Sequence, residues 1–281
     1  MIVKKVTKCL LLFLSFVIVV LLIINYSTNN KHYDFDYSSI ANNSIIAHAF
    51  GGIDDKDYTN SLEAFEYSYS NGIKVFEVDF DLTKDNVLIC SHDEDMWRNI
   101  TNSSLDYTYD NFKKTLIYNK YTPMDYMDVI NLLNKYDDII IVTDTKYSDR
   151  KTVKKQFEQL VNYAERINSD VLKRIVPQIY SESMLEYVMD VYNFDSIVYT
   201  LYQVSGWTKE NIVKYCNDSG VRFITVSQYD IEKDIIDEWS KNDINIALFT
   251  INDKDDANRF INDGISMIYS DYLKPVDIET K

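Results

Sequence analysis

Eight short runs rich in Ile, Val and other strand-forming residues recur along the chain, and segments with helical periodicity separate them. Strands that alternate with helices usually form a parallel sheet, because each helix carries the chain back to the edge where strands begin. A count of eight favours a sheet that closes into an α/β (β/α)8 barrel, a TIM barrel, over an open doubly wound sheet. The predicted strands cover residues 45–48, 75–79, 139–144, 175–179, 197–201, 222–227, 244–250 and 267–270.

A ninth strand-like run, residues 87–90, lies between the second and third barrel strands. A polar segment rich in Tyr, Asn, Asp and Thr follows it over residues 94–121. We interpret the two together as one insertion between strands two and three. No second domain boundary is evident, so a single barrel domain is predicted for residues 44–281.

The N-terminal part of the chain has the pattern of a membrane anchor. Residues 9–30 carry no charge, and the three lysines before them favour a cytoplasmic N-terminus. No small-residue cleavage site follows the apolar run, so an uncleaved transmembrane helix is favoured over a cleaved signal peptide, which is the alternative. The prediction is a cytoplasmic N-terminus (1–8), a single transmembrane anchor (9–26), a polar stalk (27–43) and a barrel outside the cytoplasmic membrane.

The formal net charge is −15, and the isoelectric point is near 4.6. Binding to nucleic acid requires a basic face that displaces counterions from the phosphates, so a nucleic-acid partner is excluded. If the substrate carries a phosphate, its attraction must come from a bound cation and a few nearby positive side chains.

Carboxylates gather at predicted strand ends. Glu77 and Asp79 are two residues apart on a strand, so their side chains point to the same face, and the same spacing recurs in Asp144 and Lys146. Three carboxylates without a nearby cysteine favour a hard cation, Mg²⁺ or Ca²⁺, over Zn²⁺. The alternative is that Glu77 and Asp79 are solvated charges at the end of a strand.

Two of the three histidines flank the Glu-x-Asp pair. His48 ends the first predicted strand, and His92 follows the ninth strand-like run. Imidazole titrates near physiological pH, so this pair is a candidate general acid and general base. The third histidine, His32, falls in the predicted stalk.

The ordered set of motifs resembles the glycerophosphodiester phosphodiesterase family, whose barrel is similar to that of phosphatidylinositol-specific phospholipase C. The resemblance covers residues 45–275. The matching residues are His48, Asn60 with Ala64 and Phe65, Gly72, Glu77, Asp79, Thr83, Asp85, His92, Asp93, Pro123, Asp144, Lys146, Gln178, Thr250, Asn252 and Asp271.

The resemblance implies hydrolysis of a phosphodiester. Glu77, Asp79 and Asp144 would hold the cation, His48 and His92 would exchange a proton between nucleophile and leaving alkoxide, and Lys146 would stabilise phosphate charge. The expected substrate is a glycerophosphodiester or a related phosphodiester derived from a lipid or a polymer.

The chain departs from the family pattern after the first histidine. His-Arg-Gly becomes His48-Ala49-Phe50, so the arginine that usually contacts the phosphate is absent; Lys146 and Arg98 are candidates to supply positive charge. The departure leaves open a second function, a membrane-tethered binding protein with impaired turnover. A third reading is a barrel hydrolase that acts on sugars through Glu77 and Asp144.

Overall fold

The computed structural model describes residues 31–40 and 42–279. The predicted cytoplasmic N-terminus and transmembrane anchor lie outside these residues, as does the start of the predicted stalk. Within the described ranges, no helix has both the length and the apolar character needed to cross a bilayer.

Eight parallel strands form a closed barrel, as the strand count predicts. The sheet order is β1-β9-β8-β7-β6-β5-β4-β2-β3, and an additional pairing of β1 with β2 closes the ring. The barrel strands are β1 (Ile45–Ala47), β2 (Val75–Leu82), β4 (Ile140–Asp144), β5 (Ile175–Ile179), β6 (Val198–Thr200), β7 (Phe223–Ser227), β8 (Asn245–Phe249) and β9 (Met267–Ser270).

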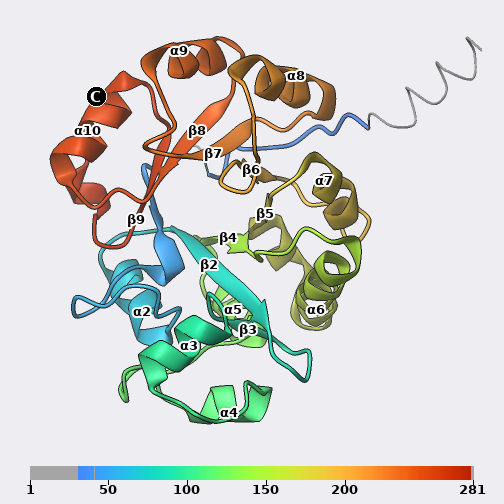
Figure 1. Cartoon of the computed structure of the whole chain (residues 1–281), viewed down its shortest axis with the longest axis vertical. Coiled ribbons are helices and arrows are strands. Elements are labelled where there is room, and N and C mark those ends of the chain that lie inside the picture. The colour runs from blue at the N-terminus through green and yellow to red at the C-terminus, as the bar shows by residue number, and fades with distance from the viewer. Residues whose placement is uncertain (1–30, 41, 280–281) are drawn as a thin grey trace, which may run out of the picture.

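Helices surround the strands (Figure 1). Side chains cap the N-termini of several of these helices. For example, the side chain of Asp125 accepts hydrogen bonds from the backbone at the start of α5, and Asp128 completes a capping box. The longer helices are α2 (Leu62–Ser70), α3 (Glu94–Thr101), α4 (Tyr109–Lys114), α5 (Tyr126–Lys135), α6 (Arg150–Ile167), α7 (Glu182–Met189), α8 (Lys209–Ser219), α9 (Lys233–Lys241) and α10 (Lys254–Asp263). Short 3-10 helices are η1 (His48–Phe50), η2 (Ser169–Arg174) and η3 (Pro275–Asp277).

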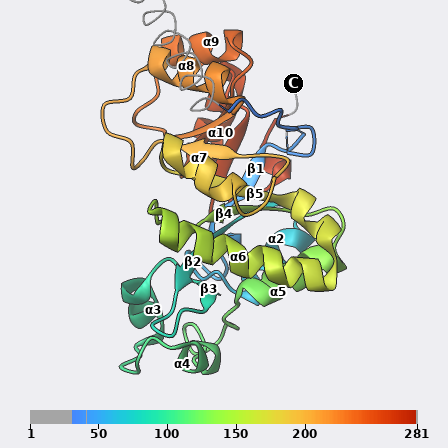
Figure 2. The ribbon, with the colours of Figure 1, turned by 90° about the vertical axis from the view of Figure 1, so that its right-hand side faces the viewer.

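The predicted insertion is present between β2 and β4. Strand β3 (Leu88–Cys90) pairs antiparallel with the far end of β2, and α3 and α4 follow it. Figure 2 shows these elements together at one end of the molecule. Ile89, Trp97, Tyr107 and Phe112 form a small core of their own, so the insertion is a packed unit beside the barrel.

The predicted stalk is wrong for residues 33–40, which pack against the barrel. The backbone N–H of Tyr33 donates to the carbonyl of Ser219 at 2.8 Å, and the Tyr37 hydroxyl donates to the carbonyl of Ile197 at 2.8 Å. Tyr37 and Ile40 are buried in one cluster with side chains from the barrel strands. Burial of these two apolar side chains holds the segment in place. The residues around them are mostly polar, so the composition of the segment predicted a stalk.

Candidate active site

The predicted site residues lie at the carboxyl ends of the first barrel strands. His48 immediately follows β1, and Asp144 is the last residue of β4. In the register of β2 and β4, Asp79 lies opposite Asp144. Because neighbouring residues in a parallel pair share a side of the sheet, this register sets two carboxylates next to each other.

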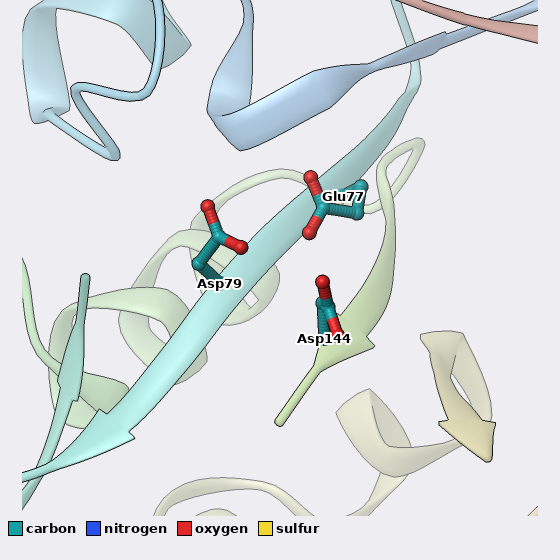
Figure 3. Close-up of side chains that lie close together, drawn as sticks. All are labelled: Glu77, Asp79 and Asp144. Carbon is teal, nitrogen blue, oxygen red and sulfur yellow. The ribbon is translucent and has the colours of Figure 1, made fainter. Parts of the chain in front are cut away.

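Glu77, Asp79 and Asp144 converge inside the barrel mouth (Figure 3). One carboxylate oxygen from each lies within 4.8 Å of the others, and all three side chains are buried. The structure therefore brings together the three residues predicted to hold a cation.

Each carboxylate is oriented by neighbouring polar groups. The backbone N–H of Ala49 donates to Oε2 of Glu77 at 2.7 Å, and Nδ2 of Asn60 donates to Oδ2 of Asp79 at 2.9 Å. The hydroxyl of Tyr180 donates to Oδ1 of Asp144. These bonds fix the direction in which the remaining oxygens point.

The other oxygen of Glu77, Oε1, is buried and has no hydrogen-bond partner within the described ranges. Burial and the neighbouring charge of Asp79 raise the pKa of Glu77 well above its ordinary value. An unpartnered buried oxygen beside two more carboxylates suits a hard divalent cation, which would compensate their charge. The donor set thus fits Mg²⁺ or Ca²⁺.

Lys146 supplies the positive charge closest to these acids. Its ammonium donates to Oδ1 of Asp79 at 2.5 Å and to Oδ2 of Asp144. Burial alone would raise the pKa of Asp79, but the charge of Lys146 lowers it below its ordinary value. One ammonium faces three carboxylates, so a further cation is still favoured.

His48 is held by a residue from the last strand region. Its Nδ1 lies 2.8 Å from Oδ1 of Asp271, whose other oxygen accepts a hydrogen bond from Nδ2 of Asn252 at 2.7 Å. Burial would lower the pKa of His48, but the bond to Asp271 and the charges of Glu77 and Asp79 raise it to about 9. Asp271 fixes the orientation of the ring through Nδ1, and Nε2 makes no hydrogen bond to any of the described residues.

Replacement of Asp271 by asparagine preserves shape but removes the charge that faces His48. If the site hydrolyses a phosphodiester, we expect kcat of that reaction to fall about 10- to 1000-fold with little change in KM. The reason is that a carboxylate that orients an imidazole stabilises mainly the transition state. The pKa of His48 should also fall from its value of about 9, since the protonated ring loses its partner. The pH profile of kcat/KM measures this, and an unchanged profile would contradict the positioning role.

His92 lies across the site. It follows β3, and its Nδ1 lies 2.6 Å from Oδ2 of Asp93. The ring of Tyr58 contacts both imidazoles edge-on, with ring centroids 4.7 Å apart for His48 and 5.5 Å apart for His92. Both predicted acid–base residues therefore face one shared space.

That space is a pocket of about 280 Å³, close to the lower end of the volumes of small-molecule sites. Its lining includes Glu77, Asp144, Lys146 and both histidines, and Tyr202, Phe249 and Tyr269 contribute aromatic surface. Arg98 is not among the lining residues, because its guanidinium binds Glu94 and the carbonyl of Ser103 on and after α3. Arg98 is thus not placed to supply the missing positive charge.

Several side chains at the site were not singled out from the sequence as functional. Tyr58 and Tyr180 carry no motif signal, and their roles depend on contacts with residues distant in the chain. The motifs that resemble the family contain Asn60, Asn252 and Asp271, and this resemblance is the sequence feature that points to a role for them in the site.

The model of the glycerophosphoryl diester phosphodiesterase family matches residues 52–274. No curated protein matches the chain.

Solved structures share the fold at low sequence identity. A phosphodiesterase from Oleispira antarctica, solved with the product sn-glycerol-3-phosphate, is 16% identical with a TM-score of 0.68, and the match covers 84% of this chain and 95% of that one. A glycerophosphodiester phosphodiesterase from Thermotoga maritima is 20% identical with a TM-score of 0.61, covering 86% and 96%. The corresponding protein from Galdieria sulphuraria is 12% identical with a TM-score of 0.68, covering 82% and 94%. These likenesses establish the barrel fold.

Proposed function

This chain belongs to the glycerophosphoryl diester phosphodiesterase family, and from that premise we propose that it is a metal-dependent phosphodiesterase whose substrate is a glycerophosphodiester or a related phosphodiester derived from a lipid or a polymer. The observation that carries the proposal is the convergence of Glu77, Asp79 and Asp144 within 4.8 Å beside two imidazoles. This combination provides a cation site and a proton-transfer pair in one pocket.

The three carboxylates would hold Mg²⁺ or Ca²⁺, and a bound cation of this kind polarises a phosphoryl oxygen and orients an attacking hydroxyl. His48 and His92 line the same pocket and both contact Tyr58, so one can accept the proton of the nucleophile while the other donates a proton to the leaving alkoxide. Lys146 would stabilise the charge of the phosphate.

The choice of a glycerol-containing substrate rests on the family and on the product bound in the Oleispira antarctica phosphodiesterase. The pocket of about 280 Å³ has aromatic walls and several hydroxyl and amide groups, among them Thr200, Gln203 and Thr225. Such a lining suits a small polar group with an apolar carbon face.

The test is hydrolysis of glycerophosphocholine by the detergent-solubilised full chain with Mg²⁺ or Ca²⁺, with sn-glycerol-3-phosphate as the measured product. We expect metal-dependent release of that product. Binding of glycerophosphocholine by calorimetry without turnover would instead support the impaired binding protein. Release of sugar from a glycoside without added metal would support the sugar hydrolase.

We also propose that the barrel lies outside the cytoplasmic membrane on an N-terminal anchor. The support is the uncharged apolar run at residues 9–26 with lysines before it. Protease added to intact cells should digest the barrel while the protein sediments with membranes. Protection of the barrel in intact cells, with digestion only after lysis, would contradict this location.

A further inference from the structure

The residue after His48 offers no side-chain contact for a phosphate. Ala49 is fully buried, and its backbone N–H is committed to Glu77. Among the described residues that line the pocket, Lys146 is the one lysine or arginine, and its ammonium is bound between Asp79 and Asp144. A phosphodiester in this pocket therefore needs a further donor.

Tyr58 is a candidate for this donor. It lines the pocket with both histidines, and its ring is nearly perpendicular to each imidazole, at 81° to His48 and 84° to His92. The ring therefore contacts both proposed proton-transfer groups within one pocket.

The backbone holds Tyr58 in this place in an uncommon conformation. Its φ is +53°, in the left-handed region that bulky residues rarely adopt. Two residues later, Asn60 exchanges two hydrogen bonds with Asp79, and four residues earlier the carboxylate of Asp54 accepts a hydrogen bond from Tyr121. Anchors on both sides therefore maintain the strain, which is a common property of segments at functional sites.

The hydroxyl of Tyr58 is available to a ligand. No hydrogen bond joins it to any residue in the described part of the chain. By contrast, the hydroxyl of Tyr269 donates to Oε1 of Gln178, and the hydroxyl of Tyr202 accepts a hydrogen bond from Nε2 of Gln203. Burial raises the pKa of Tyr58 to about 12, with contributions from Asp271 and Asp79, so the phenol remains a neutral donor at neutral pH.

The geometry points to Tyr58 as a phosphate-binding residue, whose hydroxyl donates a hydrogen bond to a non-bridging oxygen of the phosphodiester and supplies a contact that Ala49 cannot make. This inference rests on the proposed function, because it assumes that the pocket receives a phosphodiester. It assigns the hydroxyl to substrate binding and the ring to packing against His48 and His92.

The test compares Tyr58→Phe, which removes only the hydroxyl, with Tyr229→Phe in the metal-saturated full chain. Tyr229 is 89% exposed after β7 and serves as the matched control. We expect Tyr58→Phe to lower kcat/KM for glycerophosphocholine about 10- to 100-fold, as for one lost hydrogen bond to a charged group. Affinity for sn-glycerol-3-phosphate, measured by calorimetry, should fall by a similar factor. The melting temperature of Tyr58→Phe should equal that of Tyr229→Phe.

Unchanged affinity and kcat/KM in Tyr58→Phe would overturn the inference while leaving the phosphodiesterase intact. If the wild type binds sn-glycerol-3-phosphate without hydrolysing the diester, the proposed function fails, and the loss of affinity in Tyr58→Phe still decides the role of the hydroxyl. If the wild type does neither, both fail.

Discussion

Removal of divalent cations with a chelator is expected to abolish turnover and to lower the melting temperature of the protein, with both effects reversed by Mg²⁺ or Ca²⁺. Three buried carboxylates meet within 4.8 Å, and one oxygen of Glu77 has no hydrogen-bond partner in the described part of the chain. A cation bound only by the folded state stabilises it by about 2.7 kcal/mol at 100 times its Kd. For a domain of this size that corresponds to a shift of roughly 5 to 10 °C.

Replacement of Glu77 by glutamine tests whether the effects of metal come from binding at this site or from a general effect of metal on the protein. The amide keeps an acceptor for the N–H of Ala49 but loses the charge. We expect the metal-induced rise in melting temperature to disappear and kcat/KM to fall about a thousandfold or more, because metal stabilisation of the reacting charge amounts to several kcal/mol. Calorimetric metal titration and the diesterase assay measure the two effects.

The exposed helix residue Glu66 provides a matched control, since Glu66→Gln removes the same charge away from the pocket. That variant should keep both metal response and turnover. Full activity of the wild type in chelator, or of Glu77→Gln in metal, would contradict a cation held by these carboxylates.

The sequence predicted the parts of the site that depend on strand geometry. Glu77 and Asp79 share a face because side chains alternate along a strand, and Asp144 joins them because parallel strands end at one edge. Both inferences need only the spacing of residues and the direction of the strands.

Other features depend on contacts that no local pattern encodes. Tyr58 contacts both imidazoles from a backbone with φ of +53°, a conformation that is rare for tyrosine and is not predicted from its sequence. Tyr37 and Ile40 pack into the barrel from a segment whose polar composition predicted a free stalk. Asp271 reaches His48 across 223 positions of sequence. Such pairings arise from closure of the barrel.

Substrates with different leaving groups are expected to show which histidine is the general acid and which is the general base. On glycerophosphocholine, His48→Ala and His92→Ala should each lower kcat by roughly 10²- to 10⁴-fold, the usual contribution of one general acid or base. On the p-nitrophenyl ester of glycerol phosphate, the variant that lacks the general acid should recover most of its activity. The reason is that p-nitrophenolate is a weak base and leaves without a proton, whereas the alkoxide of choline requires one.

The variant that lacks the general base should stay impaired on both esters, because the nucleophile is the same in each. A difference between the two variants in their activity on the p-nitrophenyl ester therefore shows which histidine is the acid and which is the base. Glu77, Asp79 and Asp144 are unchanged in both variants, so the comparison does not depend on a change in metal binding. The contacts are compatible with this division: each imidazole has its Nδ1 against a carboxylate, Asp271 or Asp93, and each ring contacts Tyr58. Recovery of both variants, or of neither, would contradict a mechanism in which one histidine accepts the proton and the other donates it.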